Sequence, residues 1–183
     1  MDGDARNDES RSAALPLLTE RLELRAFEPE DLEALHAVYG DPEVTRFIPP
    51  YPTLEHTRRA LDIHVREARA GNPAFWALIE RESGDLIGDA GLGLIEGIGP
   101  EFELGYTLGP RWWGRGYATE AARAVRDHAL GPLALAEVLA LVRPANAASI
   151  NVLEKIGMER VGTRHAYGAE HLLYSARRAA TAP

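Results

Sequence analysis

The chain has 183 residues, of which 45% are hydrophobic and 26% charged, so a wholly disordered or collagen-like chain is excluded. The formal net charge is −8, which disfavours nucleic-acid binding and makes a cationic partner such as an amine more plausible. The absence of cysteine excludes disulfides, thiolate catalysis and cysteine metal sites. No apolar stretch approaches the roughly 20 residues that cross a bilayer. We therefore expect a cytoplasmic enzyme or binding domain with no nucleic-acid or membrane partner.

The composition along the chain predicts one domain. Residues 1–14 are charged and small, so we expect a flexible tail there and no signal peptide. Residues 15–178 contain no linker, repeat or low-complexity tract and are predicted to form a single domain, with a second short tail over 179–183.

Hydrophobic periodicity and turn residues predict the elements in chain order. Alternation around Leu22 and Leu24 predicts a strand over 20–27, and Pro29 begins a helix that Gly40 ends. Thr53 is expected to cap a second helix that runs to about 70. The remaining predictions are strands over 74–80, 86–94 and 101–108, a helix over 117–130, a strand over 137–143, a helix over 147–156, and strands over 159–165 and 171–177. This order predicts an α/β (α+β) fold with a mixed sheet of about seven strands and four helices on its faces.

A glycine-containing loop between a strand and a helix is the most informative stretch. The strand ends at Leu108, the loop contains Gly114 and Gly116, and the helix begins at about Tyr117. Such a turn directs backbone N–H groups and the positive end of a helix dipole toward one point, which suits a phosphate, and Arg115 adds a cationic donor. An ordinary strand-to-helix turn is the alternative. A P-loop is not supported, because the sequence has no GxxxxGK[ST] motif.

A second strand-to-helix junction carries polar residues. Asn146 is expected to cap the helix over 147–156 or to direct its amide toward a ligand between the strands. Ser149 lies one turn into that helix, where it is either a solvated residue or a proton donor to a departing sulfur.

The two stretches resemble the GNAT acetyltransferase superfamily. The run Arg111-Trp112-Trp113-Gly114-Arg115-Gly116 matches its (Q/R)xxGx(G/A) acyl-CoA loop. The branch that acetylates ribosomal-protein N-termini, the RimJ/RimL-like group, is similar in several further segments. These are Thr19–Arg25, Glu103–Tyr106, Gly114–Ala121, Asn146–Ser149 and Glu154–Met158. The resemblance covers about 17–178 and implies a splayed mixed sheet with acetyl-CoA bound where two parallel strands separate.

The resemblance also implies which residues bind acetyl-CoA. Backbone groups of Tyr106, Thr107 and Leu108 would pair with the pantetheine arm. The diphosphate would lie against Trp113, Gly114, Arg115, Gly116, Tyr117, Ala118 and Thr119. Asn146 would bind the pantetheine, Ser149 would lie near the sulfur, and Lys155 with Arg115 would meet the ribose phosphate.

Transfer to an amine requires a base, because an ammonium must lose a proton before it attacks a thioester. Glu103 is the candidate base on the strand that carries the thioester in the family, and Glu101 is two residues away on the same face. Many family members have a tyrosine acid where this chain has Leu153. Protonation of the leaving group is therefore expected from Ser149, from water or from no residue.

The acceptor is expected to lie beside the first two helices and their loop. Phe47, Ile48 and Tyr51 are predicted to line this wall and Tyr167 to close the other side, whereas Trp76 is expected to pack in the core. The 6 histidines show no metal-ligand spacing, so no metal is expected.

The sequence predicts an acetyl-CoA-dependent N-acetyltransferase that acts on a protein N-terminus or a small-molecule amine. A homodimer is possible. Two other readings are a non-catalytic acyl-CoA-binding or regulatory domain of the same fold, and a nucleotide-binding module that shares only the glycine loop.

Overall fold

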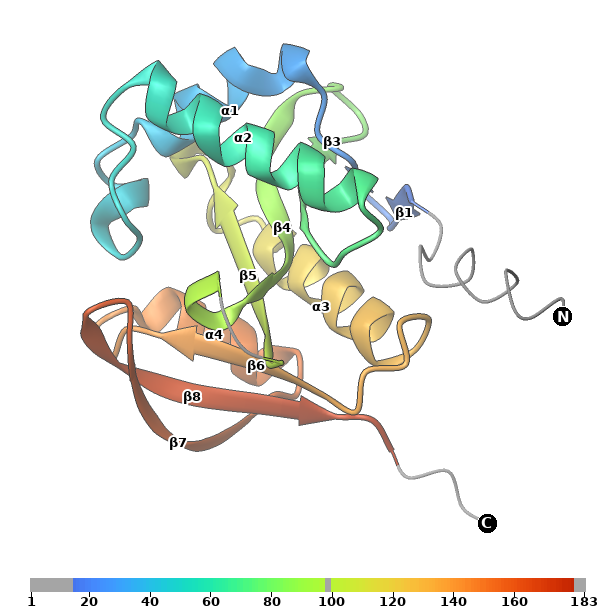
Figure 1. The fold of residues 1–183 in the computed structure, drawn as a ribbon, viewed down its shortest axis with the longest axis vertical. Helices are drawn as coiled ribbons and strands as arrows, with labels where there is room; N and C mark the ends of the chain where they lie inside the picture. The colour runs from blue at the N-terminus through green and yellow to red at the C-terminus, as the bar shows by residue number, and fades with distance from the viewer. Residues whose placement is uncertain (1–14, 98–99, 180–183) are drawn as a thin grey trace, which may run out of the picture.

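A computed structural model describes residues 15–97 and 100–179 of the chain (Figure 1). The tail predicted over 1–14, and 180–183 of the tail predicted over 179–183, lie outside the described residues.

The described residues form the predicted helices and strands together with one short additional strand. The helices are α1 (Leu32–Tyr39), α2 (Leu54–Arg69), α3 (Tyr117–Leu130) and α4 (Ala147–Lys155). The strands are β1 (Leu17–Leu18), β2 (Leu22–Arg25), β3 (Phe75–Glu80), β4 (Leu86–Leu94), β5 (Phe102–Leu108), β6 (Glu137–Val142), β7 (Glu159–Ala166) and β8 (Ala169–Arg177).

The strands form one sheet in the order β1-β2-β3-β4-β5-β6-β8-β7. Neighbours are antiparallel except for β5 and β6, which are parallel and share a single register pair, Glu103 with Leu139. Beyond that pair the two strands separate, and β6, β8 and β7 run across the direction of β3–β5 in Figure 1. The splayed mixed sheet implied by the family resemblance is therefore confirmed.

Helices cover both faces of the sheet. Alternation along β3 turns Trp76 and Leu78 into a core shared with α3 and α4, and turns Ala77 and Ile79 into a second core beneath α1 and α2. The gap between β5 and β6 thus lies between two well-packed layers, which fix its shape.

Local hydrogen bonds explain where the elements differ from the sequence prediction. The first helix begins as a 3-10 turn, Pro29–Asp31, in which the Glu28 N–H donates to the Asp31 carboxylate at 2.8 Å, and α1 begins only at Leu32. The α2 cap is confirmed, because the Thr53 side chain accepts from the His56 N–H. β1 has two residues, too few to produce a periodic pattern.

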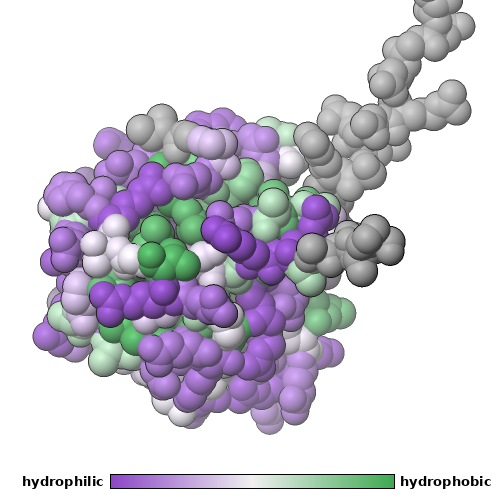
Figure 2. All heavy atoms as spheres, turned by 90° about the horizontal axis from the view of Figure 1, so that it is seen from below, coloured by the Kyte–Doolittle hydropathy of each residue, from purple (hydrophilic) through white to green (hydrophobic). Residues whose placement is uncertain are grey.

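Strand β7 forms one edge of the sheet and is mostly solvent-exposed. It carries the charged residues Glu159, Arg160 and Arg164, which oppose pairing with another strand edge. Viewed from below, this side of the molecule is largely hydrophilic, with apolar side chains gathered toward the middle (Figure 2).

Candidate active site

Two cavities meet where β5 and β6 separate. The one that we call the sheet cavity has a volume of about 370 Å³ and is lined mainly by β4, β5 and the loop between α1 and α2. The other, the loop cavity, has a volume of about 410 Å³ and extends to the glycine loop and the start of α3. Six residues line both cavities: Phe47, Ile48, Tyr106, Thr107, Asn146 and Ser149. The two cavities therefore meet at the gap in the sheet.

The start of α3 presents free backbone donors to the loop cavity. Its N-cap, Gly116, has φ +84° and supplies no side-chain cap, so the N–H groups of the first turn have no side-chain partner. Gly114 has φ +73° and nothing lies within 4 Å of the position a Cβ would occupy. Both glycines thus adopt a backbone that other residues avoid, and the helix dipole favours an anion here.

A charged network supports this helix end from behind. The Glu120 carboxylate accepts from the Thr19 hydroxyl at 2.6 Å and from the Arg21 Nε at 2.8 Å. Arg21 also donates to the Arg115 carbonyl at 2.9 Å. The network offsets the negative charge of Glu120 and ties the glycine loop to β2. No sequence pattern predicts a role in the site for Arg21 and Glu120, because they lie 99 residues apart in the chain.

One edge of β5 faces the gap. Gly109 donates its N–H to Ile87 on the β4 side, so the alternating backbone turns Tyr106 and Leu108 toward β6 and Thr107 toward β4. The Leu108 carbonyl already accepts from the Trp113 indole at 2.7 Å. Of the three residues expected to pair with pantetheine, Tyr106 has the backbone position best suited to do so, because the backbone groups of Thr107 face β4 and the Leu108 carbonyl is occupied.

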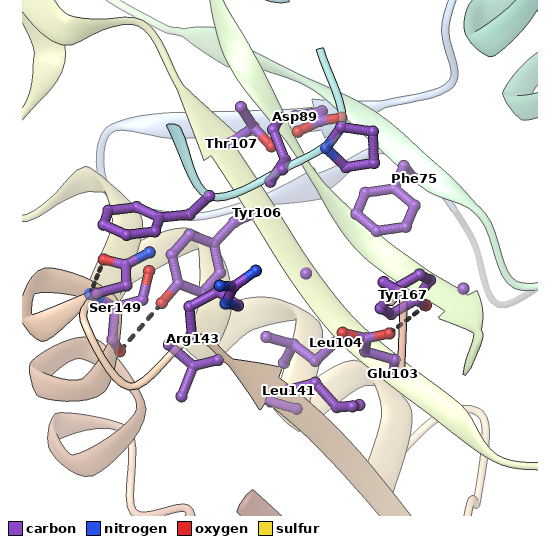
Figure 3. Close-up of a pocket in the computed structure, with 18 of the residues that line it drawn as sticks. Phe75, Asp89, Glu103, Leu104, Tyr106, Thr107, Leu141, Arg143, Ser149 and Tyr167 are labelled. Atoms are coloured by element: carbon purple, nitrogen blue, oxygen red, sulfur yellow. Dashed lines mark hydrogen bonds between the residues drawn. The ribbon is translucent and has the colours of Figure 1, made fainter. Parts of the chain in front are cut away.

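The start of α4 meets β5 through Tyr106. The Asn146 side chain accepts from the Ser149 N–H at 3.2 Å, which is the capping geometry predicted from the sequence. The Tyr106 hydroxyl donates to the Ser149 carbonyl at 3.3 Å (Figure 3). Burial raises the pKa of Tyr106 to about 12, so its hydroxyl stays protonated at neutral pH. Lys155 is exposed at the other end of α4 and lines the loop cavity.

Glu103 and Tyr167 lie together in the sheet cavity. The Tyr167 hydroxyl donates to the Glu103 carboxylate at 2.6 Å (Figure 3) and accepts from the Glu96 N–H at 2.9 Å. Burial raises the pKa of Glu103, although the bond from Tyr167 opposes that shift. Glu101 is not among the residues that line either cavity and forms an ion pair with Arg164 at 2.6 Å.

The residues predicted to lie beside the acceptor line the sheet cavity, whereas Trp76 lies in the core. Phe47, Ile48 and Tyr51 line the sheet cavity, where the Tyr51 ring lies 4.4 Å from that of Tyr39. Trp76 is buried in the core and packs edge-on against His128, as the sequence favours.

The described part of the chain has neither a cluster of metal-ligating side chains nor a membrane-spanning helix. Residues 15–97 and 100–179 contain no group of three or more His, Cys, Asp or Glu residues able to hold a metal ion. Within the same residues, no helix has both the length and the apolar character needed to span a membrane.

Comparison with known proteins identifies the family. A model of the acetyltransferase (GNAT) domain matches residues 21–159. The chain belongs to the GNAT acetyltransferase family. It is 32% identical over 153 residues to the uncharacterized N-acetyltransferase p20 of Bacillus licheniformis, covering 82% of this chain and 86% of that protein. These matches support an acetyl-CoA-dependent N-acetyltransferase that transfers an acetyl group to an amine.

Solved structures share the fold of this GNAT acetyltransferase. An acetyltransferase from Agrobacterium tumefaciens aligns with a TM-score of 0.78 and 30% identity, covering 91% of this chain and 96% of that one. RimL, a ribosomal L7/L12 alpha-N-protein acetyltransferase in complex with coenzyme A, aligns with a TM-score of 0.76. At 18% identity, over 90% of this chain and 98% of that one, RimL shows likeness of fold alone.

The loop cavity of this GNAT acetyltransferase fits a coenzyme that carries a diphosphate. The uncapped N–H groups of α3 and the left-handed Gly114 and Gly116 form an open cradle for an anion, and the exposed Lys155 adds a cation at its rim. Acetyl-CoA supplies the activated acetyl thioester that the family transfers. The residues present thus suit the family's co-substrate without rearrangement of the backbone.

Proposed function

We propose that acetyl-CoA occupies the loop cavity and that the acceptor amine occupies the sheet cavity. The observation that carries this proposal is that both cavities share Tyr106 and Ser149 at the gap between β5 and β6. Trp113 to Thr119 hold the diphosphate, and the free edge of β5 at Tyr106 with Asn146 holds the pantetheine arm. The amine then approaches the thioester from the opposite side of the gap.

Glu103 acts as the base. Its half-buried carboxylate lies in the sheet cavity and its pKa is raised, so it accepts a proton more readily than an exposed glutamate. It takes the proton from the acceptor ammonium, directly or through a water. The neutral nitrogen then bonds to the acetyl carbon as the carbon–sulfur bond breaks. The nitrogen releases its second proton to form the amide, which balances the proton that the leaving thiolate takes up.

Two hydroxyl groups are placed to return a proton to the leaving thiolate. Ser149 lines both cavities, and the Tyr106 hydroxyl reaches the Ser149 backbone at 3.3 Å. Leu153 lines the sheet cavity and has no proton to give. The chain therefore offers Ser149, with Tyr106 beside it, in place of the tyrosine acid of many relatives.

The acceptor is a primary amine of a small molecule or of a protein N-terminus. A cavity of about 370 Å³ suits a compact amine or the first residues of a peptide. The net charge of −8 favours the approach of a cation.

The test is the Glu103→Gln variant with acetyl-CoA and a panel of amines that includes peptides beginning with Ala or Ser. Thiol release should fall by about 10²-fold or more, because a general base contributes at least that much, while the Kd for acetyl-CoA stays unchanged. Glu159→Gln, which removes a glutamate charge from exposed β7, should retain full activity. Full activity of Glu103→Gln at every pH would show that Glu103 is not the base.

A further inference from the structure

A second carboxylate is buried at the sheet cavity. Asp89 lies in β4 among small and apolar residues and is 1% exposed. The Tyr39 hydroxyl donates to its Oδ2 atom, whereas Oδ1 is buried and has no hydrogen-bond partner among the described residues. Asp89 lines the sheet cavity, where Figure 3 shows it beside Thr107 and apart from Glu103 and Tyr167. A buried carboxylate oxygen with no partner is costly, so its presence at a cavity points to a ligand group.

The register of the sheet places Asp89 and Glu103 on one face. Asp89 is opposite Thr107, and Glu103 precedes Thr107 by four residues on β5. Paired and alternate residues of a sheet share a face, and four residues of strand, about 13 Å, separate the backbone positions of the two residues. Between them lies Gly105, against which the Phe75 ring packs so closely that a Cβ would be 2.8 Å from it. The cavity floor is thus apolar between two acidic ends.

Asp89 forms no ion pair among the residues that the structure describes. Among the residues that line the sheet cavity, Asp89, Glu103 and Arg143 carry formal charges, and Arg143 is solvent-exposed. His64 also lines the cavity, but burial lowers its pKa to about 4, so it is neutral at neutral pH. Burial raises the pKa of Asp89 to about 6, although the Tyr39 hydroxyl and the side chain and backbone of Thr107 oppose that shift. The carboxylate is therefore largely ionised above neutral pH.

The aromatic rings beside Asp89 suit a cation. The Tyr39 and Tyr51 rings pack 4.4 Å apart, and both residues line the sheet cavity with Asp89. Aromatic faces attract ammonium groups, most strongly when these are removed from water. The same site would gain little from a neutral or anionic group, which would leave the carboxylate uncompensated.

We infer that Asp89, with Tyr39 and Tyr51, binds a second cationic nitrogen of the acceptor. The inference rests on the proposed function, because it assumes that the sheet cavity takes the acceptor. The preferred acceptor is then a small molecule with two amino groups. One nitrogen loses its proton and is acetylated near Glu103, while the other stays protonated and pairs with Asp89.

The test compares acceptors that differ only at the distant end. The probes are α,ω-diaminoalkanes of three to six carbons, with amino alcohols and n-alkylamines of matching length, assayed at pH 8. For the unmodified enzyme, kcat/KM of the best diamine should exceed that of its matched alkylamine by about 10-fold or more, because a buried charge pair is strengthened by the apolar surroundings. Equal values for the three classes at every length would overturn the inference without the need for any variant.

The Asp89→Asn variant tests whether Asp89 causes the preference for diamines over alkylamines. Asparagine keeps the shape and the bond from Tyr39 but removes the charge, so the diamine should lose its advantage while kcat/KM of the alkylamine stays within about threefold. Asp62→Asn, which makes the same change on the exposed surface of α2, should keep the full preference. If Asp89→Asn slows both acceptors by the same factor, the carboxylate is structural and the inference is wrong.

A binding measurement separates this inference from the proposed function. With CoA present, diamines should raise the Tm of the unmodified enzyme more than alkylamines do, and Asp89→Asn should abolish that difference. A difference in Tm without turnover of any amine would support the cation site and contradict the proposed function. Turnover of monoamines and diamines at equal rates would support the proposed function and contradict the cation site.

Discussion

Two opposing effects set the pKa of Glu103, the base that we propose. Burial disfavours the ionised form of Glu103 and raises its pKa, whereas the hydrogen bond from the Tyr167 hydroxyl stabilises that form and lowers the pKa. The observed balance leaves the pKa above its ordinary value. Tyr167 therefore keeps the proposed base available at a lower pH than burial alone would allow.

The Tyr167→Phe variant tests this balance. Loss of the hydroxyl removes a contact that favours the carboxylate, so the pKa of Glu103 should rise further. A base must be deprotonated to act, and the acidic limb of the kcat/KM profile should therefore move to higher pH while the rate well above that limb approaches that of the unmodified enzyme. The pH–rate profile is the measurement. A uniform loss of rate at all pH values would instead indicate a role in shape alone.

The two glutamates near the start of β5 show what a sequence pattern resolves at this scale. Alternation places Glu101 and Glu103 on the same face and does not distinguish them. The structure does so through β7, from which Arg164 pairs with Glu101, and through Tyr167 in the β7–β8 turn, which binds Glu103. Both partners lie more than 60 residues further along the chain, and only the fold brings them to β5.

At the scale of elements, the start of α3 depends on backbone rather than side chains. Gly114 and Gly116 hold left-handed conformations, and Gly116 leaves the first turn of the helix uncapped. A residue with a Cβ at either position would strain the loop and shift the N–H groups that face the loop cavity.

The Gly114→Ala variant tests this role, and the chain supplies a matched control. Gly71, just after α2, has the same φ of +73° and equally open space around it, but it does not line either cavity. Both alanine variants should lose about 1 kcal/mol of unfolding free energy in urea titrations. Only Gly114→Ala should also weaken acetyl-CoA binding, by about 10-fold in a calorimetric titration. Equal affinities in the two variants would remove the glycine loop from the proposed coenzyme site.

Helices and strands that are bounded by glycine, proline or other turn residues could be predicted from the sequence. Contacts between distant segments of the chain could not. The bounds of β4 and α3 agree with their predictions, since Ser83-Gly84 and Gly131-Pro132 interrupt the periodic pattern beside them. The network of Arg21 with Glu120 and the pair of Tyr39 with Asp89 join distant segments. Asp89 is the one charged residue in the otherwise apolar and glycine-rich strand β4, and this is the only local feature that sets it apart. Hydrophobic periodicity does not indicate a function for it.

At the scale of the whole molecule, the arrangement of the sheet accounts for two cavities that meet. β5 and β6 share one register pair before they separate, and helices on both faces hold the two halves of the sheet in place. The gap is bordered by the start of α4 on one side and by the loop between α1 and α2 on the other. Because Tyr106 and Ser149 line both cavities, the two ligands can be bound together and can react without a protein-bound intermediate.

This geometry predicts sequential kinetics. Both substrates should bind before either product leaves, so double-reciprocal plots at several fixed amine concentrations should intersect rather than run parallel. CoA should compete with acetyl-CoA and show non-competitive inhibition toward the amine, because the two ligands occupy different cavities. The chain contains no cysteine, the strongest candidate for an acetylated nucleophile, so incubation with acetyl-CoA alone should leave the mass of the protein unchanged. Parallel plots together with an acetylated protein would show instead that transfer proceeds in two covalent steps, and that the meeting of the cavities serves another purpose.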